Sequence, residues 1–182
     1  MKYEEITIAL KNGQNCLLRS PTAEDAEAML QYFRQTCGET EFMGRYEDEI
    51  IMKVEDEQNL LDEIINDPKR AMIAAFIDNK LVANIGFSWI EPFERFRHRA
   101  GFGMSILKDF WGLGIGSALM EALIEAARKA EYEQLELEVV AENERAIALY
   151  KKFGFEIFGT RENTLKYRDG HYCAAHLMMK KL

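Results

Sequence analysis

The stretch of sequence that decides the fold is residues 104–119, which read MSILKDFWGLGIGSAL. In its first part apolar residues alternate with polar ones, which is typical of a strand, and it ends in an Ala- and Leu-rich run that is typical of a helix. Between these parts Gly112, Gly114 and Gly116 stand at every second position. The stretch therefore predicts a strand, a tight turn and a helix in direct succession.

A glycine-lined helix start is suited to binding phosphate. The first N–H groups of a helix have no intrahelical partner and carry the positive end of the helix dipole, and glycine leaves the backbone open to a close approach. The spacing excludes two phosphate motifs, because the Gly-Lys-Ser/Thr of a P-loop is missing and Ser117 or Leu119 occupies the sixth position of a Rossmann fingerprint. A tight turn without a ligand remains the alternative at this point.

A second strong pattern spans residues 143–155, which read NERAIALYKKFGF. Asn143 suits the N-cap of a helix, Gly154 suits the first position after its end, and apolar residues recur between them at helical spacing. Just before this run, residues 135–139 alternate apolar and acidic side chains. They predict a strand that runs parallel to the strand at the start of residues 104–119.

Together the two patterns resemble the GCN5-related N-acetyltransferase family, the GNAT family. The loop from Trp111 to Gly116 is similar to the family's pyrophosphate loop, and the run from Asn143 to Phe155 matches every named position of N-x-x-A-x-x-L-Y-x-x-x-G-F. Many members carry Arg or Gln where this chain has Trp111, and the Trp-Gly-x-Gly version is similar to the ribosomal-protein N-terminal acetyltransferases. The resemblance covers residues 70–160, whereas the N-terminal third is compatible only in the order of its elements.

The resemblance implies a cosubstrate and a set of contacts. Acetyl-CoA would bind as the acetyl donor without a metal, with the backbone N–H near Ile106 facing the thioester carbonyl and Asn143 touching the pantetheine arm. Tyr150 would lie near the thiol as cofactor contact and general acid, with a core tyrosine as the alternative. Lys152 is interpreted as a surface lysine, with a contact to the 3′-phosphate as the alternative. The amides that would hold the pyrophosphate belong to Trp111, Gly112, Leu113, Gly114, Ile115, Gly116 and Ser117.

The sequence does not assign the general base. The amine could lose its proton to a side chain directly or through a water relay. The candidates are Glu41, Glu91, His98, Glu136 and Glu138. An acceptor pocket could be walled by Phe42, Trp89, Phe93 and Phe96, although aromatic residues are more often part of a core.

Composition and charge narrow the class of protein. The chain has 182 residues, of which 48% are hydrophobic and 30% charged, which fits one globular domain over residues 1–182. A net charge of −8 argues against a nucleic-acid partner and mildly favours a cationic amine. Three widely spaced cysteines indicate reduced thiols, and neither a signal peptide nor an apolar run near the ~18 residues of a membrane span is found. A cytoplasmic protein without membrane contact is expected.

The remaining patterns predict an α+β fold. Apolar spacing of three to four residues predicts helices over residues 22–38, 55–66 and 114–130, the first with Thr22 as N-cap and Gly38 at its end. Strands are predicted over residues 14–19, 71–77, 80–90, 155–160, 163–167 and 172–180, with a hairpin turn at Asp78-Asn79. We expect a mixed, twisted sheet of six to seven strands flanked by helices on both faces and parallel only at its centre, as in the GNAT fold.

The predicted function is transfer of acetyl from acetyl-CoA to a primary amine by direct attack in a ternary complex. The acceptor is a small molecule or a peptide. It is either a protein N-terminus, as the Trp-Gly-x-Gly version suggests, or a small cationic amine such as a polyamine. A non-catalytic acyl-CoA-binding sensor is the alternative from another class, whereas the glycine spacing disfavours a dinucleotide oxidoreductase. The sequence leaves open whether the chain forms a homodimer.

Overall fold

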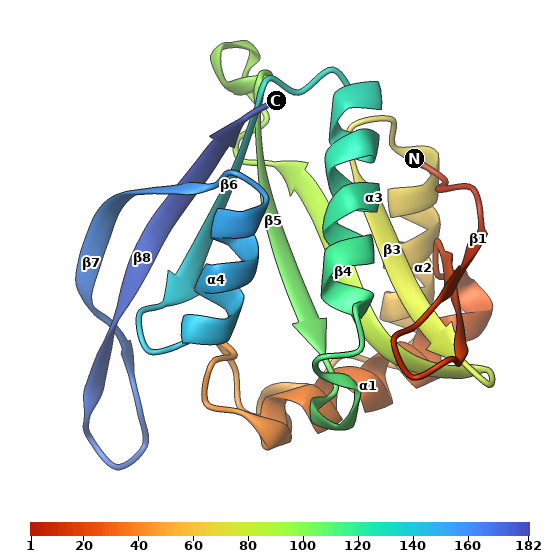
Figure 1. Cartoon of the computed structure of the whole chain (residues 1–182), viewed down its shortest axis with the longest axis horizontal. Coiled ribbons are helices and arrows are strands. Elements are labelled where there is room, and N and C mark those ends of the chain that lie inside the picture. Colours follow the sequence, from red (N-terminus) through yellow and green to blue (C-terminus); the bar gives the residue numbers. More distant parts are fainter.

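A mixed sheet of eight strands runs through the computed structural model, which describes residues 1–182 (Figure 1). The strands lie in the order β1-β2-β3-β4-β5-β6-β8-β7. Only β5 and β6 are parallel neighbours, and every other pair is antiparallel. The predicted α+β class, with a sheet parallel only at its centre, is therefore confirmed. The strands are β1 (Ile6–Ala9), β2 (Asn15–Arg19), β3 (Ala71–Ile77), β4 (Lys80–Trp89), β5 (Arg99–Ile106), β6 (Gln134–Val140), β7 (Glu156–Lys166) and β8 (Tyr172–Lys181).

Helices cover both faces of this sheet. The helices α3 (Ile115–Lys129) and α4 (Glu144–Lys152) lie in front of it in Figure 1, and α1 (Ala26–Glu39) and α2 (Val54–Asn66) lie on the other side. The larger hydrophobic core packs α3 against the central strands, and a smaller core packs α1 and α2 against the opposite face of β3 and β4. No helix is both long enough and apolar enough to cross a membrane.

The parallel pair β5–β6 opens after three residues. Residues 99–101 of β5 pair with residues 134–136 of β6, and no pairing follows along the remainder of the two strands. The strands start side by side and separate toward their C-terminal ends (Figure 1). Backbone groups on the facing edges beyond this point therefore have no neighbouring strand to bond to. The gap lies next to the glycine-rich loop that follows β5.

The number of strands differs from the prediction because of the N-terminus. The sheet has eight strands rather than six to seven, since residues 6–9 form β1 and pair with β2. The Asn12-Gly13 turn closes this hairpin, and its sequence is a known hairpin signal. Ile6 and Ile8 alternate with Thr7 and Ala9, and this alternation was the pattern from which the strand could have been predicted.

Two further boundaries differ in detail. Gly38 lies inside the last turn of α1 rather than after it. A Cβ at this position would lie 2.6 Å from Glu47 Oε2, so glycine here permits close packing and does not end the helix. The runs 155–160 and 163–167 form one strand, β7, whose pairing with β8 is irregular between Arg161 and Leu165.

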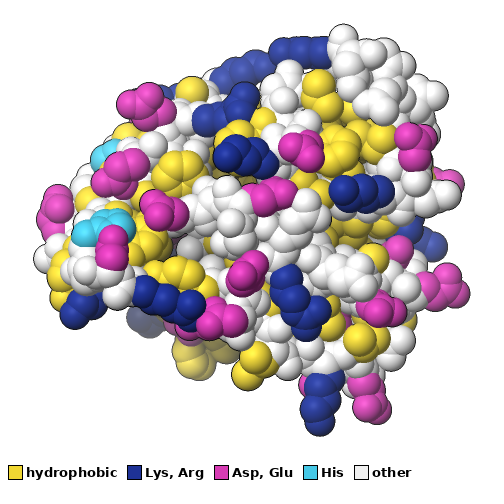
Figure 2. Space-filling model, turned by 90° about the horizontal axis from the view of Figure 1, so that it is seen from below, with side chains coloured by type: hydrophobic (Ala, Val, Ile, Leu, Met, Phe, Trp, Pro, Cys, Tyr) yellow, Lys and Arg dark blue, Asp and Glu magenta, His cyan; other side chains and the backbone are white.

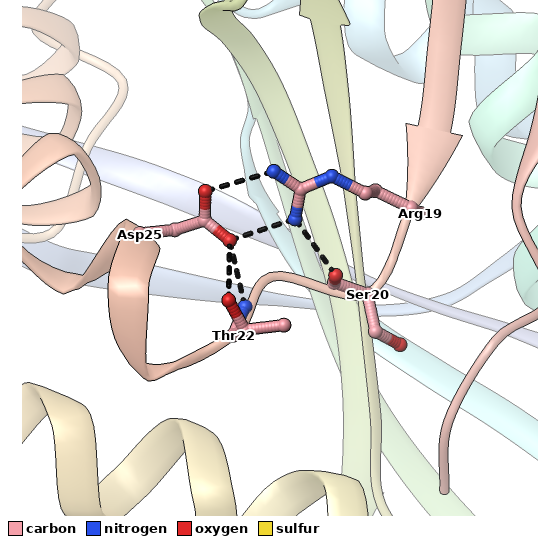
Figure 3. A network of polar contacts seen from close by, with 4 residues as sticks. All are labelled: Arg19, Ser20, Thr22 and Asp25. Carbon is pink, nitrogen blue, oxygen red and sulfur yellow. Dashed lines mark hydrogen bonds and ion pairs between the residues drawn. The ribbon is translucent and has the colours of Figure 1, made fainter.

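A largely buried ion pair fixes the start of α1 to the end of β2 (Figure 3). The two carboxylate oxygens of Asp25 accept hydrogen bonds from Arg19 at 2.7 and 2.8 Å. One of them also accepts from the backbone N–H of Thr22 at 2.7 Å and from its hydroxyl at 3.2 Å. Thr22 is the N-cap of the 3₁₀ turn Ala23–Asp25 that leads into α1, whereas the N-cap of α1 itself is Asp25. Burial raises the pKa of Asp25, but the bonds from Arg19 and Thr22 outweigh it and hold the pKa below its usual value.

Asp25→Asn is expected to lower the free energy of unfolding at pH 7 by about 2 kcal/mol, because the ion pair and part of the cap are lost. Since the pKa of Asp25 is lower in the folded chain, the carboxylate stabilises the fold fully above its unfolded pKa of about 3.9. This contribution is lost as the pH falls through the lower, folded pKa. Urea unfolding of both proteins should therefore show a smaller difference at pH 3 than at pH 7. An equal difference at both pH values would contradict this role.

Candidate functional site

The glycine-rich loop joins the end of β5 to the start of α3. A single 3₁₀ turn over Lys108–Phe110 leads into it, and α3 begins directly behind it. Gly112 and Gly114 have φ of +82° and +101°, a left-handed conformation that favours glycine. The backbone N–H groups of residues 112–116 donate to no other backbone group of the protein. Consecutive free donors at a helix N-terminus are suited to bind an anion.

Three cationic side chains surround this loop, and none of them forms an ion pair within the protein. Lys11 comes from the β1–β2 turn, and its backbone N–H bonds to the loop. Arg145, in the first turn of α4, lies over Trp111 with 5.1 Å between its guanidinium and the ring centre. Lys152 donates to Ser117 Oγ at 3.3 Å. In a chain of net charge −8, three unpaired cations beside free amides favour a polyanionic ligand.

Sequence reasoning had considered Lys152 but missed Lys11 and Arg145. Lys11 reaches the loop because the sheet brings the β1–β2 hairpin beside it, and no local spacing encodes that approach. Arg145 lies two residues after Asn143, the N-cap of α4. Its position in the first turn of a helix that begins beside a phosphate loop was the signal that could have indicated a phosphate contact.

A cavity of about 600 Å³ lies between this loop, the end of β5 and the start of α4. We call it the loop cavity. Leu113 and Ile115 do not line it, because their side chains pack into the hydrophobic core, so these two residues offer only backbone N–H groups. The predicted residues that do line it are Ile106, Trp111, Gly112, Gly114, Gly116, Ser117, Asn143 and Tyr150.

The backbone of Ile106 faces the gap between β5 and β6. The N–H of Leu107 bonds to the carbonyl of Val82 in β4 at 2.9 Å. Because bonding alternates along an antiparallel strand, the N–H and C=O of Ile106 point to the opposite edge. The carbonyl accepts a bond from Trp111 Nε1 at 2.7 Å, which leaves the N–H directed into the gap. Trp111 thus fixes the strand end beside which the loop begins.

Asn143 caps a helix and also lines the loop cavity. Its Oδ1 accepts from the N–H of Ala146 at 3.2 Å, which confirms the predicted N-cap of α4. The side chain also lines the loop cavity, where its NH₂ group keeps its donors. Gly154, with φ of +81°, follows the end of α4 as expected.

Tyr150 lines the loop cavity and is buried, with an exposed fraction of 6%. Its ring packs edge-on against Phe102 and Phe155, with 5.7 and 6.2 Å between the ring centres. Burial alone raises the pKa of its hydroxyl to about 12, and no hydrogen bond from the protein contributes. The hydroxyl is therefore protonated at neutral pH and free to bond to a ligand.

A second cavity of about 970 Å³ is lined by residues of α1 and α2 and of the strands β3 to β8. We call it the sheet cavity. The two cavities share lining residues at the gap between β5 and β6, so they lie next to one another there. Tyr150 lines both cavities and lies where they meet. The other residues that line both are Phe42, Met43, Met104, Ser105 and Asn143.

The carboxylates of the sheet cavity are paired with arginines. Glu136 accepts two bonds from Arg99 at 2.5 and 2.8 Å, and Arg99 holds the pKa of Glu136 below its usual value. Glu138 accepts two bonds of 2.9 Å from Arg161. Both side chains line the cavity. The arginines thus neutralise both carboxylates, which makes them weaker candidates for a general base.

Of the other predicted bases and aromatic residues, some line the sheet cavity and some do not. Phe42 and Trp89 line the sheet cavity. The residues that do not line it are Glu41, Glu91, Phe93, Phe96 and His98. No single side chain near the gap stands out as a base, so a water relay stays among the alternatives.

The surface around the open end of the two strands carries both signs of charge. Figure 2 views the molecule from the end where β5 and β6 separate, and acidic and basic side chains are interspersed there with hydrophobic ones. This face therefore lacks the continuous basic patch that nucleic-acid binding requires.

Comparison with known proteins identifies the family. Residues 22–155 match the family model described as the acetyltransferase (GNAT) family. The chain belongs to the GNAT family. This GNAT protein is 32% identical over 122 residues to the L-amino acid N-acetyltransferase AaaT of Escherichia coli, an alignment that covers 65% of this chain and 73% of that protein. It is 39% identical over 69 residues to the ribosomal protein bS18-alanine N-acetyltransferase of Escherichia coli, covering 38% of this chain and 47% of the relative.

Solved structures of GNAT proteins agree with the fold. An acetyltransferase of the GNAT family from Streptococcus pneumoniae superposes with a TM-score of 0.88 at 27% identity, covering 92% of this chain and 99% of the other. The ribosomal-protein-alanine N-acetyltransferase from Brucella melitensis gives a TM-score of 0.80 at 26% identity, covering 91% and 99%. The predicted family resemblance is confirmed, and the family supports an acetyl-CoA-dependent N-acetyltransferase.

Proposed function

We propose that this GNAT protein transfers acetyl from acetyl-CoA to a primary amine by direct attack in a ternary complex. The observation that carries the proposal is the meeting of the loop cavity and the sheet cavity at the gap where β5 and β6 part. An anion site lies on one side of this gap and a largely apolar chamber on the other. Two substrates can thus approach one point from opposite faces of the sheet, as a direct transfer requires.

The loop cavity suits the donor substrate. The free amides of residues 112–116 and the cations Lys11 and Arg145 would hold the pyrophosphate of acetyl-CoA, and Lys152 would reach its 3′-phosphate. The NH₂ group of Asn143 would donate to the pantetheine arm. Solved GNAT structures support this use, since those from Salmonella typhimurium and Sinorhizobium meliloti were determined with acetyl-CoA. When bound, this donor supplies an acetyl thioester.

The residues at the gap would then perform the transfer. A new N–C bond forms and the C–S bond breaks, while the amine loses one proton to water or a base and the thiolate gains one. The N–H of Ile106 would donate to the carbonyl oxygen as it becomes negative. Tyr150 would protonate the leaving thiolate, because its hydroxyl is protonated, unpaired and located at the gap.

The lining of the sheet cavity favours an acceptor with a bulky apolar group. Of its 30 lining residues 18 are hydrophobic, and its two carboxylates are neutralised by Arg99 and Arg161. A polyamine needs unpaired carboxylates for its several charges, and this chamber offers none. We therefore favour the α-amine of an apolar amino acid or of a peptide N-terminus. The amino-acid and ribosomal-protein acetyltransferases among the relatives support this class.

A thiol-release assay with acetyl-CoA and a panel of amines tests the function. L-leucinamide and a peptide with an apolar N-terminus are expected to raise the rate at least tenfold above hydrolysis, because their side chains fit the sheet cavity. Spermidine, an aminoglycoside and lysine serve as charged comparisons and should be poorer acceptors. Binding of acetyl-CoA with no transfer to any amine would favour the non-catalytic sensor, and a preference for spermidine would contradict the acceptor class.

A further inference from the structure

A buried tyrosine of α1 forms a hydrogen bond with the backbone at the end of β5. Tyr32 has an exposed fraction of 3% and lies in the middle of the helix. Its hydroxyl donates to the carbonyl oxygen of Ser105 at 2.7 Å and also lies 2.7 Å from Ser105 Oγ. Ser105 lines both cavities and directly precedes Ile106, so this contact is made beside the gap.

The peptide group between Ser105 and Ile106 has its C=O toward β4 and its N–H toward the gap. The N–H of Leu107 bonds to the carbonyl of Val82 in β4 at 2.9 Å. Because bonding alternates along an antiparallel strand, the C=O of Ser105 also points to β4, whereas the N–H of Ile106 points away from it. The two groups belong to one planar trans peptide. Tyr32 therefore bonds to the opposite end of the peptide group whose N–H faces the gap.

These hydrogen bonds form a chain that ends at the gap. The single hydroxyl hydrogen of Tyr32 is used on the carbonyl oxygen of Ser105, so the hydroxyl of Ser105 donates to Tyr32 Oη. Bonds in such a chain polarise one another, and a bond to a peptide C=O makes the N–H of the same peptide a stronger donor. Burial raises the pKa of Tyr32, so its hydroxyl keeps the proton that it donates. The pairing with β6 ends at Gly101, so no bond from that strand holds this peptide group.

We propose that Tyr32 is a positioning residue for acetyl transfer, because its hydroxyl orients and strengthens the N–H of Ile106 as a donor to the thioester carbonyl. This inference rests on the proposed function and adds a residue that touches neither substrate. As the carbonyl oxygen becomes negative during the transfer, a more polarised N–H stabilises it more than it stabilises the ground state. The hydroxyl of Tyr32 therefore acts on kcat and leaves the binding of both substrates unchanged.

Tyr32→Phe tests this role by the split between kcat and KM. One oxyanion donor is worth roughly 10²–10³-fold in kcat, and a neighbouring bond strengthens a donor by roughly 10–30%, so kcat for L-leucinamide should fall about two- to eightfold. The KM for L-leucinamide and the dissociation constant of acetyl-CoA should not change. Phenylalanine keeps the ring packing in the core that α1 and α2 share with the sheet. A wild-type kcat, or a loss that appears only in KM, would overturn the proposal.

The infrared band of the thioester carbonyl gives a readout that does not depend on turnover. It is measured on acetyl-CoA labelled with ¹³C at the carbonyl and bound without an amine, and a stronger hydrogen bond lowers its frequency. The band should move to higher frequency in Tyr32→Phe. It should move to lower frequency in Tyr32→3-fluorotyrosine, whose hydroxyl is a stronger donor. The second variant keeps the ring and the bond, so it tests the proposal even if the phenylalanine variant does not fold. An unmoved band would overturn the proposal, even with a lower kcat.

Tyr132→Phe is the matched control. Tyr132 is also a buried tyrosine whose hydroxyl donates to a backbone carbonyl, that of Lys69, but it lines neither cavity. Its loss should lower the unfolding temperature and leave both kcat and the carbonyl band unchanged. If the wild-type protein acetylates no amine at all, the proposed function fails and this inference with it. Transfer by wild type with an unaffected Tyr32→Phe variant refutes the inference alone.

Discussion

Tyr150→Phe is expected to lower kcat about 100-fold while the dissociation constant of acetyl-CoA stays the same. A positioned general acid contributes roughly 10²–10⁴-fold, and phenylalanine removes the proton donor alone. The fold should not suffer, because the ring packing against Phe102 and Phe155 is kept and the hydroxyl has no partner in the protein. Thiol release at saturating substrates measures kcat, and calorimetric titration measures binding. An unchanged kcat would rule out Tyr150 as the acid.

Tyr132→Phe provides the control for this experiment. Tyr132 is as buried as Tyr150, and burial likewise raises its pKa to about 12. Its hydroxyl, however, donates to the carbonyl oxygen of Lys69 at 2.9 Å, away from both cavities. We expect this variant to keep full activity and to lose about 1 kcal/mol of unfolding free energy. The two tyrosines should thus separate a chemical effect from a structural one.

Gly114→Ala is expected to weaken acetyl-CoA binding about 100-fold. A side chain at φ of +101° costs about 1–2 kcal/mol, and the loop can relieve this strain only by turning its N–H groups away from the anion site. Each charge-assisted bond lost there is worth roughly 1.5–3 kcal/mol. Calorimetric titration with acetyl-CoA gives the dissociation constant. The added Cβ itself has room, since its nearest atom is Lys11 Cγ at 4.0 Å.

Gly170→Ala separates strain from binding. Gly170 has a similar φ of +94° and no atom within 4 Å of an added Cβ, but it lies in the β7–β8 turn. Both variants should lose a similar part of their unfolding free energy. Only Gly114→Ala should lose affinity for acetyl-CoA. Equal affinity in the two variants would mean that the glycine-rich loop is not the phosphate site.

The local parts of this fold and site could be predicted from the sequence, because each depends on residues that are close together in the chain. Positive φ at Asp78 and Asn79 matches the expected hairpin, and Asn143 caps α4 as its position suggests. Residues of the glycine-rich loop and Tyr150, which belong to the two family motifs, line one cavity. Periodicity and turn residues act over a few positions, which is why these predictions agree with the structure.

The parts that sequence reasoning missed depend on contacts between distant segments. Lys11 reaches the loop only through the order of the sheet, and Arg145 lies over Trp111 only because the start of α4 lies beside the loop. The arginine partners of Glu136 and Glu138 come from β5 and β7, so their neutralisation could not be inferred from charge counts. Burial and pairing are tertiary properties, and they decide which polar residues are chemically available.

The two-sided arrangement of the cavities has a kinetic consequence. The loop cavity is lined mostly by the glycine-rich loop and the start of α4, and the sheet cavity is lined mostly by the strands and by residues of α1 and α2. Neither ligand has to pass the other's chamber to reach the gap, so steric blocking imposes no compulsory order of binding. Free coenzyme A would then compete with acetyl-CoA for the loop cavity but leave the opposite chamber accessible. Under the proposed function, the opening between two strands would let the supply of the donor and the supply of the acceptor act independently on the rate.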